Sequence, residues 1–257
     1  EHGRAKAVAG VPPDYFSETG QLWGNPLYEW RVMEEDGFSF WRARLHCQLE
    51  RFDLLRLDHF RALAAHWSVP AGALDARGGA WHPTPGRAFL KAVRDEFGDL
   101  PIVAEDLGLI TPDVVELRKE FGLPGMRVLQ FAFGGDPDDL HLPHMHERDC
   151  IVYTGTHDND TTLGWYLSLD SETQRRVEYF LRLTPGAMPE ALVRVALGSV
   201  GELAIIPMQD VLGLGSEARL NTPGTSVGNW SWRLTEGALT SDLARRFALL
   251  NKMHARV

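Results

Sequence analysis

The sequence predicts an α/β fold with a parallel sheet, because short apolar runs alternate with segments of helical periodicity. Five runs have the composition of buried strands, at residues 54–57, 101–105, 126–131, 150–154 and 202–207. Three of them lead directly into acidic segments, which contain Asp58, Glu105 and Asp158. Since side chains converge on ligands at the carboxyl ends of parallel strands, these acids are expected to share one site.

The first 31 residues lack helical periodicity and are rich in glycine, proline and asparagine, which predicts a long loop without secondary structure. Its aromatic side chains are Tyr15, Phe16, Trp23, Tyr28 and Trp30. Long loops of this kind are often functional, and exposed rings can stack on a planar or sugar-like ligand. The alternative is that the rings only pin the segment to the core.

The remaining elements follow in chain order. Helices are expected at residues 38–52, 60–67, 87–97, 111–121, 171–183, 189–199 and 241–254, and loops at 70–86, 136–149 and 213–228. Gly98 suits the end of the third helix, and Thr111-Pro112-Asp113 suits the start of the fourth. Residues 1–257 are therefore expected to form one domain, with an aromatic loop region at 1–35 and β/α units at 36–257.

Only five β/α units are visible, and the first strand begins near residue 54. A closed (β/α)8 barrel needs eight strands and typically about 250 residues or more. The sequence therefore predicts either an open sheet or the later part of a larger barrel.

Composition limits the classes of partner. The 257 residues carry a formal charge of −9, from 26 basic and 35 acidic side chains, and no basic tract stands out, which argues against nucleic-acid or anionic-membrane partners. Cys47 and Cys150 lack the spacing of a metal or redox motif and are expected to be buried free thiols in a reducing cytoplasm. No apolar run reaches the roughly 18 residues of a membrane span.

The acids at the strand ends suit glycosidic chemistry. Asp58 and Glu105 follow consecutive strands, and neighbouring strands lie about 4.8 Å apart. Cleavage with retention needs one carboxylate as nucleophile and one as acid/base, about 5 to 5.5 Å apart. Arg56 shares a strand face with Asp58 and could hold it ionised. Asp158 could orient sugar hydroxyls and favour a positively charged transition state.

Other interpretations of the same residues were weighed. His59 and His157 adjoin these acids and could donate to a substrate hydroxyl, whereas any single acid could be a helix cap or an arginine partner. A cation site at 157–160 lacks the EF-hand spacing, and no nucleotide-binding motif is present. The histidines of the 136–149 loop, which are His141, His144 and His146, are expected on a solvated face instead of a zinc site. No metal or cofactor is therefore expected.

Three motifs carry a family resemblance. Arg56–Arg61 (RLDHFR), Ala104–Gly108 (AEDLG) and Thr156–Asp160 (THDND) resemble, in this order, the catalytic motifs of amylomaltases, the 4-α-glucanotransferases of the α-amylase clan. Further similar stretches lie at residues 8–17, 20–28, 122–133 and 228–233, so that the resemblance runs from about residue 8 to the end of the chain.

The resemblance implies strands four to eight of a TIM (β/α)8 barrel, since members of the family carry three strands and further material before the stretch that matches residue 8. It implies Asp58 as nucleophile, Glu105 as acid/base and Asp158 as transition-state stabiliser. Substrate-binding residues would be Arg56, His59, His157, Asp14, Tyr15, Phe16, Trp23 and Asn229.

The function implied is transfer of α-1,4-glucan segments between maltooligosaccharides by double displacement, without a cofactor. Two alternatives remain at this point. One is an α-glucan hydrolase that uses the same carboxylates, and the other is a non-catalytic glucan-binding fragment of an incomplete barrel.

Overall fold

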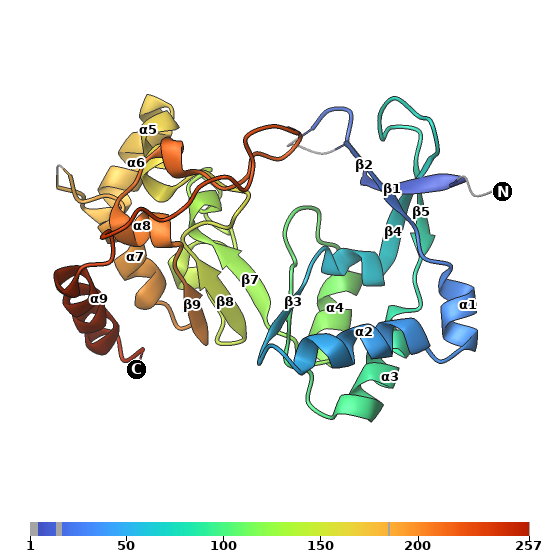
Figure 1. Ribbon diagram of the computed structural model, residues 1–257. Coiled ribbons are helices and arrows are strands. Elements are labelled where there is room, and N and C mark those ends of the chain that lie inside the picture. The colour runs from blue at the N-terminus through green and yellow to red at the C-terminus, as the bar shows by residue number, and fades with distance from the viewer. Residues whose placement is uncertain (1–4, 14–16, 185, 257) are drawn as a thin grey trace. The chain divides into compact units, whose positions relative to one another are not determined.

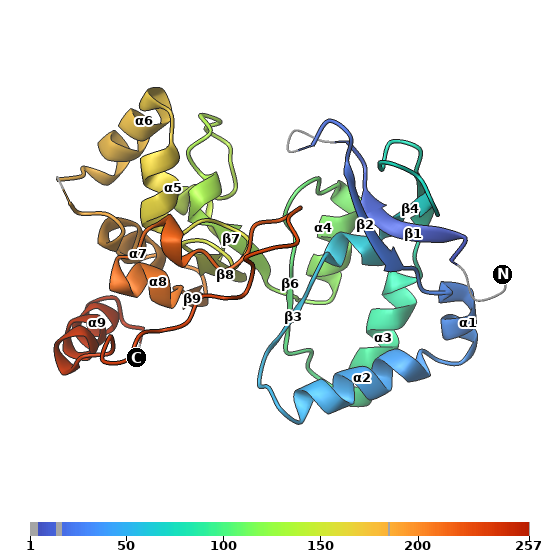
Figure 2. The same cartoon turned by 45° about the horizontal axis from the view of Figure 1, so that its top comes forward.

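Residues 5–13, 17–184 and 186–256 are described by the computed structural model, and their contacts divide the chain into two units. The first unit is Glu1–Gly125 and the second is Met126–Val257 (Figures 1 and 2). Each unit is described by itself.

An antiparallel sheet in the first unit combines β1 (Ala7–Val11), β2 (Gln21–Pro26), β4 (Ala65–Pro70) and β5 (Ala80–Pro83), in the order β2-β1-β4-β5. Three predictions need correction here. Residues 1–31 are not a loop without secondary structure, and 70–86 is not only loop. The predicted helix at 60–67 is present only as a 3-10 turn over Phe60–Leu63, and the chain then enters β4. The reason is pairing over long sequence distances, in which Val8 lies opposite Val69 and Trp67 opposite Trp81. Cross-strand packing of this kind leaves little signal in a local pattern.

A parallel pair in the same unit joins β3 (Leu55–Leu57) to β6 (Ile102–Ala104). The helices of this unit are α1 (Trp30–Glu35), α2 (Ser39–Leu49), α3 (Gly86–Phe97) and α4 (Pro112–Glu120), and a 3-10 turn, η1 (Phe60–Leu63), follows β3. Phe89, Leu90 and Val93 of α3 are fully buried against Phe60 and Ile102. Gly98 ends α3 with a φ of +74°, as predicted.

The second unit contains a sheet in the order β7-β8-β9, from β7 (Gly125–Val128), β8 (Cys150–Tyr153) and β9 (Leu203–Ile205). β8 and β9 are parallel, with Val152 opposite Ala204. The other elements are η2 (Leu129–Phe131), η3 (Pro143–Met145), α5 (Thr162–Ser168), α6 (Ser171–Leu181), α7 (Glu190–Leu197), α8 (Met208–Leu212), η4 (Ser216–Ala218) and α9 (Ser241–Met253). Both views show α6 and α7 on the same side of this sheet.

The mixed α/β class is confirmed, and each of the five predicted strands overlaps an observed one, namely β3, β6, β7, β8 and β9. The predicted strand at 126–131 ends earlier, at Val128, where the chain turns into η2. Helices α5 and α8 were not predicted, because seven and five residues are too few to display a helical period. No helix within the described ranges is long and apolar enough to cross a membrane.

Two expectations about single side chains need correction. Cys47 and Cys150 are both free thiols, but Cys47 is exposed on α2 while Cys150 is buried in β8. His146 lies in the interior instead of on a solvated face, and its ring nitrogens contact Ser199 Oγ at 2.7 Å and the carbonyl oxygen of His141 at 3.0 Å. Satisfied hydrogen bonds explain why a polar ring can be buried there.

Candidate active site

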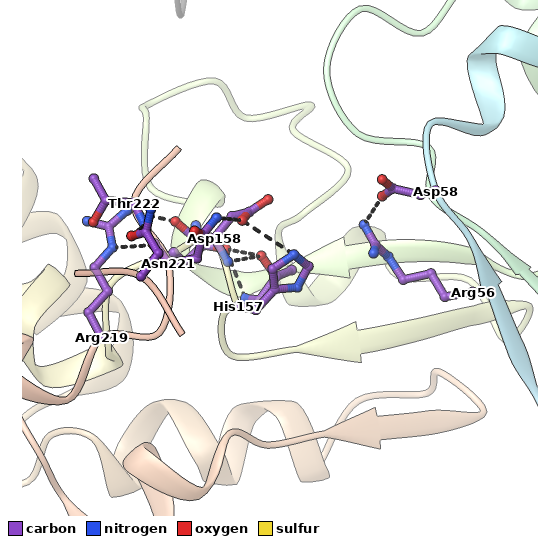
Figure 3. Close-up of polar contacts among 10 residues, drawn as sticks. Arg56, Asp58, His157, Asp158, Arg219, Asn221 and Thr222 are labelled. Atoms are coloured by element: carbon purple, nitrogen blue, oxygen red, sulfur yellow. Dashed lines mark hydrogen bonds and ion pairs between the residues drawn. The ribbon is translucent and has the colours of Figure 1, made fainter. Parts of the chain in front are cut away.

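Asp58 and Glu105 each follow the last residue of a strand in the parallel pair, and the last paired residues, Leu57 and Ala104, lie opposite each other. Arg56 donates from Nη2 to Asp58 Oδ1 over 2.6 Å, which confirms that they lie on the same side of β3 (Figure 3). The Asp58 side chain is 77% exposed. A solvent-facing carboxylate therefore stands beside a cation at the carboxyl end of β3.

Glu105 occupies a different environment from Asp58. The residue is only 9% exposed, and Oε2 and Oε1 accept hydrogen bonds from the backbone N–H groups of His59 at 2.7 Å and Leu107 at 2.8 Å. Burial raises the pKa of Glu105 and the charge of Asp58 adds to this rise, while the two N–H donors and Arg56 oppose it. One exposed acid and one buried acid with a raised pKa suit different roles in acid/base chemistry.

His59 connects the two strand ends. It adopts a left-handed conformation with φ of 49°, and the next residue, Phe60, donates its N–H to the carbonyl oxygen of Glu105 at 3.0 Å. Burial lowers the pKa of His59 to about 4, so the ring is neutral at physiological pH. Within the described ranges its Nε2 is buried without a hydrogen-bond partner, and the Trp23 ring of β2 lies edge-on at 4.8 Å.

In the second unit, a tight turn follows β8. Asn159 Oδ1 accepts hydrogen bonds from both the N–H and the hydroxyl of Thr156, each 2.8 Å long. Asp160 accepts from Ser216 Oγ at 2.6 Å and from the N–H of Thr161 at 2.8 Å, which makes it a support of the turn. Asparagine and aspartate commonly build such turns by bonding to nearby backbone.

Asp158 projects from this turn and is contacted from a distant part of the sequence (Figure 3). Its Oδ1 accepts a 2.6 Å hydrogen bond from Asn221 Nδ2 and lies 3.3 Å from His157 Nε2. Its carbonyl oxygen accepts from Arg219 Nη2 at 2.7 Å. The ring of Trp230 lies 5.3 Å from that of His157, the residue before Asp158, at an interplanar angle of 33°.

A buried acid lies at the base of the same region. Asp210, 3% exposed, accepts from the hydroxyls of Thr154 at 2.5 Å and Thr162 at 2.7 Å, and from the Thr162 N–H at 2.8 Å. These three bonds connect the segment after β8 to the start of α5 and to α8. They compensate the burial of Asp210 and fix the base of the turn that carries Asp158.

The predicted site residues are placed in two groups. The first unit brings together Arg56, Asp58, His59, Glu105 and Trp23, and the second holds His157 and Asp158. Asp14, Tyr15 and Phe16 lie outside the described residues. Asn229 closes its own loop: its Oδ1 accepts from the Thr222 N–H at 2.9 Å and its Nδ2 donates to the Thr225 carbonyl oxygen at 2.9 Å.

Sequence reasoning missed Arg219, Asn221 and Trp230 as site residues. Arg219 and Asn221 lie in a loop without strand, helix or motif signal, more than 60 positions after Asp158. Trp230 lies in a stretch that carries the family resemblance, which was the one available signal. Within the part of the chain that the structure describes, no group of three or more His, Cys, Asp or Glu side chains is arranged to hold a metal ion.

Comparison with known proteins identifies the family to which the chain is similar. A family model described as 4-alpha-glucanotransferase matches residues 2–240. The 4-alpha-glucanotransferase of Thermus thermophilus is 48% identical over 266 residues, covering 100% of this chain and 53% of that protein. The chloroplastic/amyloplastic 4-alpha-glucanotransferase of Arabidopsis thaliana is 52% identical over 228 residues, covering 88% of this chain and 40% of that protein.

A solved structure of the amylomaltase from Streptococcus agalactiae, in complex with acarbose, superposes with a TM-score of 0.93 at 34% sequence identity. The superposition covers 98% of this chain and 51% of that one. The chain thus spans about half the length of the relatives it matches. Since the family model covers almost the whole sequence, the chain belongs to the 4-alpha-glucanotransferase family.

Proposed function

We propose that the protein is a 4-α-glucanotransferase that transfers α-1,4-glucan segments between maltooligosaccharides with retention of configuration. The observation that carries this proposal is the contrast between Asp58, exposed beside Arg56, and Glu105, buried with a raised pKa at the end of the neighbouring strand. Family membership and the sugar-like ligand named for the Streptococcus agalactiae amylomaltase, acarbose, support the substrate class.

In the first step, an oxygen of Asp58 attacks the anomeric carbon and the bond to the glycosidic oxygen breaks. Glu105 gives its proton to that leaving oxygen, which departs with the reducing-end fragment. Burial suits Glu105 to this role, because a raised pKa keeps a carboxyl group protonated closer to neutral pH. The product is a glycosyl ester on Asp58 and a free carboxylate on Glu105.

In the second step, Glu105 accepts the proton of the 4-hydroxyl of another glucan, whose oxygen attacks the anomeric carbon and releases Asp58. Transfer exceeds hydrolysis only where acceptor binding excludes water. We assign this to the segment that contains Asp14, Tyr15, Phe16 and Trp23. Support for this assignment comes from Trp23, whose ring packs against His59 next to Glu105.

Asp158 is proposed as the group that stabilises the positively charged transition state. We also propose four residues that bind the glucan, namely Arg56, His59, His157 and Asn229. The ring of His59 is neutral, and its buried Nε2 has no hydrogen-bond partner among the described residues. We propose that this nitrogen forms a hydrogen bond with a sugar hydroxyl.

We also propose that the chain forms part of a (β/α)8 barrel. Strands β3, β6, β7, β8 and β9 are inferred to be strands four to eight of a (β/α)8 barrel, within one catalytic domain. The half of the relatives that this chain does not match would hold the first three strands. The two free cysteines are compatible with the predicted cytoplasmic location.

The test is product analysis on maltotriose with the complete gene product. Transfer yields glucose and oligosaccharides longer than maltotriose, whereas glucose and maltose alone would indicate the hydrolase alternative. Asp58→Asn and Glu105→Gln are each expected to lower turnover at least about 1000-fold, and Asp242→Asn, at a side chain 89% exposed on α9, should leave it unchanged. Wild-type turnover in Asp58→Asn would refute the assignment.

A further inference from the structure

We propose that Asn221 is a positioning residue for the Asp158 carboxylate, held in place by the loop of residues 219–230. This inference rests on the proposed function, in which Asp158 faces the developing positive charge. Asn221 lies 63 positions after Asp158, and the two side chains meet at 2.6 Å (Figure 3).

The two carboxylate oxygens of Asp158 have different contacts. Oδ1 accepts from Asn221 Nδ2 and lies 3.3 Å from His157 Nε2. No partner contacts Oδ2 within residues 5–13, 17–184 and 186–256, and the side chain is 46% exposed. One oxygen is therefore held by the protein while the other remains available to a substrate.

Arg219 fixes the distance between the loop and the turn. Its Nη2 donates to the carbonyl oxygen of Asp158 at 2.7 Å, and its Nε donates to the carbonyl oxygen of Asn221 at 2.8 Å. One planar guanidinium thus contacts the main chain of both residues. Because Arg presents its donors in a rigid fork, the geometry between the two backbones is set more closely than a flexible lysine could set it.

The loop also has bonds that maintain its own shape. The N–H of Trp230 donates to the carbonyl oxygen of Leu220 at 2.7 Å, which closes the loop at its base. Asn229 braces the interior through Thr222 and Thr225. Trp230 lies beside His157, so the same loop contacts two residues of the turn: Asn221 bonds to Asp158, and Trp230 packs near His157.

The chemistry of an amide suits this role. A carboxylate that stabilises a developing cation must already point at it, since reorienting during the reaction adds to the barrier. A lysine or arginine at position 221 would fix Asp158 but would also neutralise its charge. The neutral amide of Asn221 restrains the carboxylate while its full negative charge remains available to the substrate.

The experiment measures kcat and KM on maltotriose with the complete gene product carrying Asn221→Ala or Asn221→Asp. Both are expected to lower kcat about 10- to 100-fold with KM changed less than about threefold, because misorientation affects the transition state more than ground-state binding. Asn221→Asp preserves the side-chain shape but replaces the donor by a like charge, so its kcat should be the lower of the two.

Asn251→Asp is the matched control, because the amide of Asn251 donates to the carbonyl oxygen of Phe247 in α9, and it should keep wild-type kcat. Thermal unfolding of every variant separates positioning from a loss of folded protein. If Asn221→Asp keeps wild-type kcat, or loses it only in proportion to the folded fraction, the inference is wrong. Wild-type turnover in Asp158→Asn would instead refute the proposed function itself.

Discussion

The backbone N–H of His59 donates a 2.7 Å hydrogen bond to Glu105 Oε2, from a residue in the left-handed region at φ 49°. A non-glycine residue in that region costs about 1 kcal/mol or more, and it persists where surrounding structure compensates. Here the compensation includes the second bond, from the Phe60 N–H to the Glu105 carbonyl oxygen. The turn after β3 therefore orients the acid that follows β6.

The first prediction concerns the coupling between the two acids of the first unit. Replacing Asp58 by Asn should lower the pKa of Glu105, because the charge of Asp58 is one of the causes that raise it. A ¹³C NMR titration of the Glu105 carboxyl carbon would measure the shift. Asp99→Asn, at an exposed side chain before the opposite end of β6, should leave it unchanged. An unaltered Glu105 titration in Asp58→Asn would contradict the coupling.

The second prediction concerns His59, whose pKa is lowered to about 4, chiefly by burial. Between pH 6.5 and 4 the unfolded chain binds a proton at this position that the folded chain does not, so stability falls as the pH falls through that window. Each unit of depression corresponds to about 1.4 kcal/mol. The test is the variant His59→Asn, because asparagine tolerates the left-handed conformation. Between pH 7 and pH 4.5 this variant should lose less free energy of unfolding than the wild type, as measured by urea denaturation.

The control for that measurement is His46→Asn, because His46 lies exposed on α2, and this variant should keep the wild-type dependence on pH. NMR gives an independent measurement. The imidazole signals of His59 should not shift between pH 5.5 and 8, and a midpoint near 6.5 would show that the ring is not desolvated.

The third prediction concerns Arg256, whose guanidinium donates to four carbonyl oxygens between the end of α7 and the start of β9. These belong to Leu197 at 2.9 Å, Ser199 at 2.6 Å, Gly201 at 2.7 Å and Glu202 at 3.1 Å. Arg256→Ala should lower the free energy of unfolding of the second unit by about 2 kcal/mol or more, since charged donors are lost from partly buried acceptors. Urea denaturation would measure the change.

The control for Arg256→Ala is Arg245→Ala, which removes an arginine from the protein surface. Arg245 is 72% exposed and pairs with Asp242 within α9, so its removal should change stability by less than about 0.5 kcal/mol. Equal effects of the two substitutions would show that the contacts of Arg256 do not stabilise the turn.

Local features of the fold could be predicted from the sequence because their causes lie within a few residues. Gly98 ends α3 and Pro112 opens α4, since left-handed and fixed backbone angles are properties of those residue types. Arg56 contacts Asp58 because residues two apart on a strand share a face. The acids Asp58, Glu105 and Asp158 were found in the same way, from their positions at strand ends.

Only the tertiary structure decided the features that depend on distant partners. The antiparallel sheet of β1, β2, β4 and β5 forms through pairs such as Val8 and Val69, and the turn after β8 is held by Asn221. Such contacts require the chain to close long loops. The stabilisation comes from packing and hydrogen bonding with a distant residue, and local propensity does not reveal it. The sequence by itself therefore predicted the strands that precede these acids and named the acids as candidates, whereas the burial of Glu105 and the support of Asp158 depend on how distant segments pack.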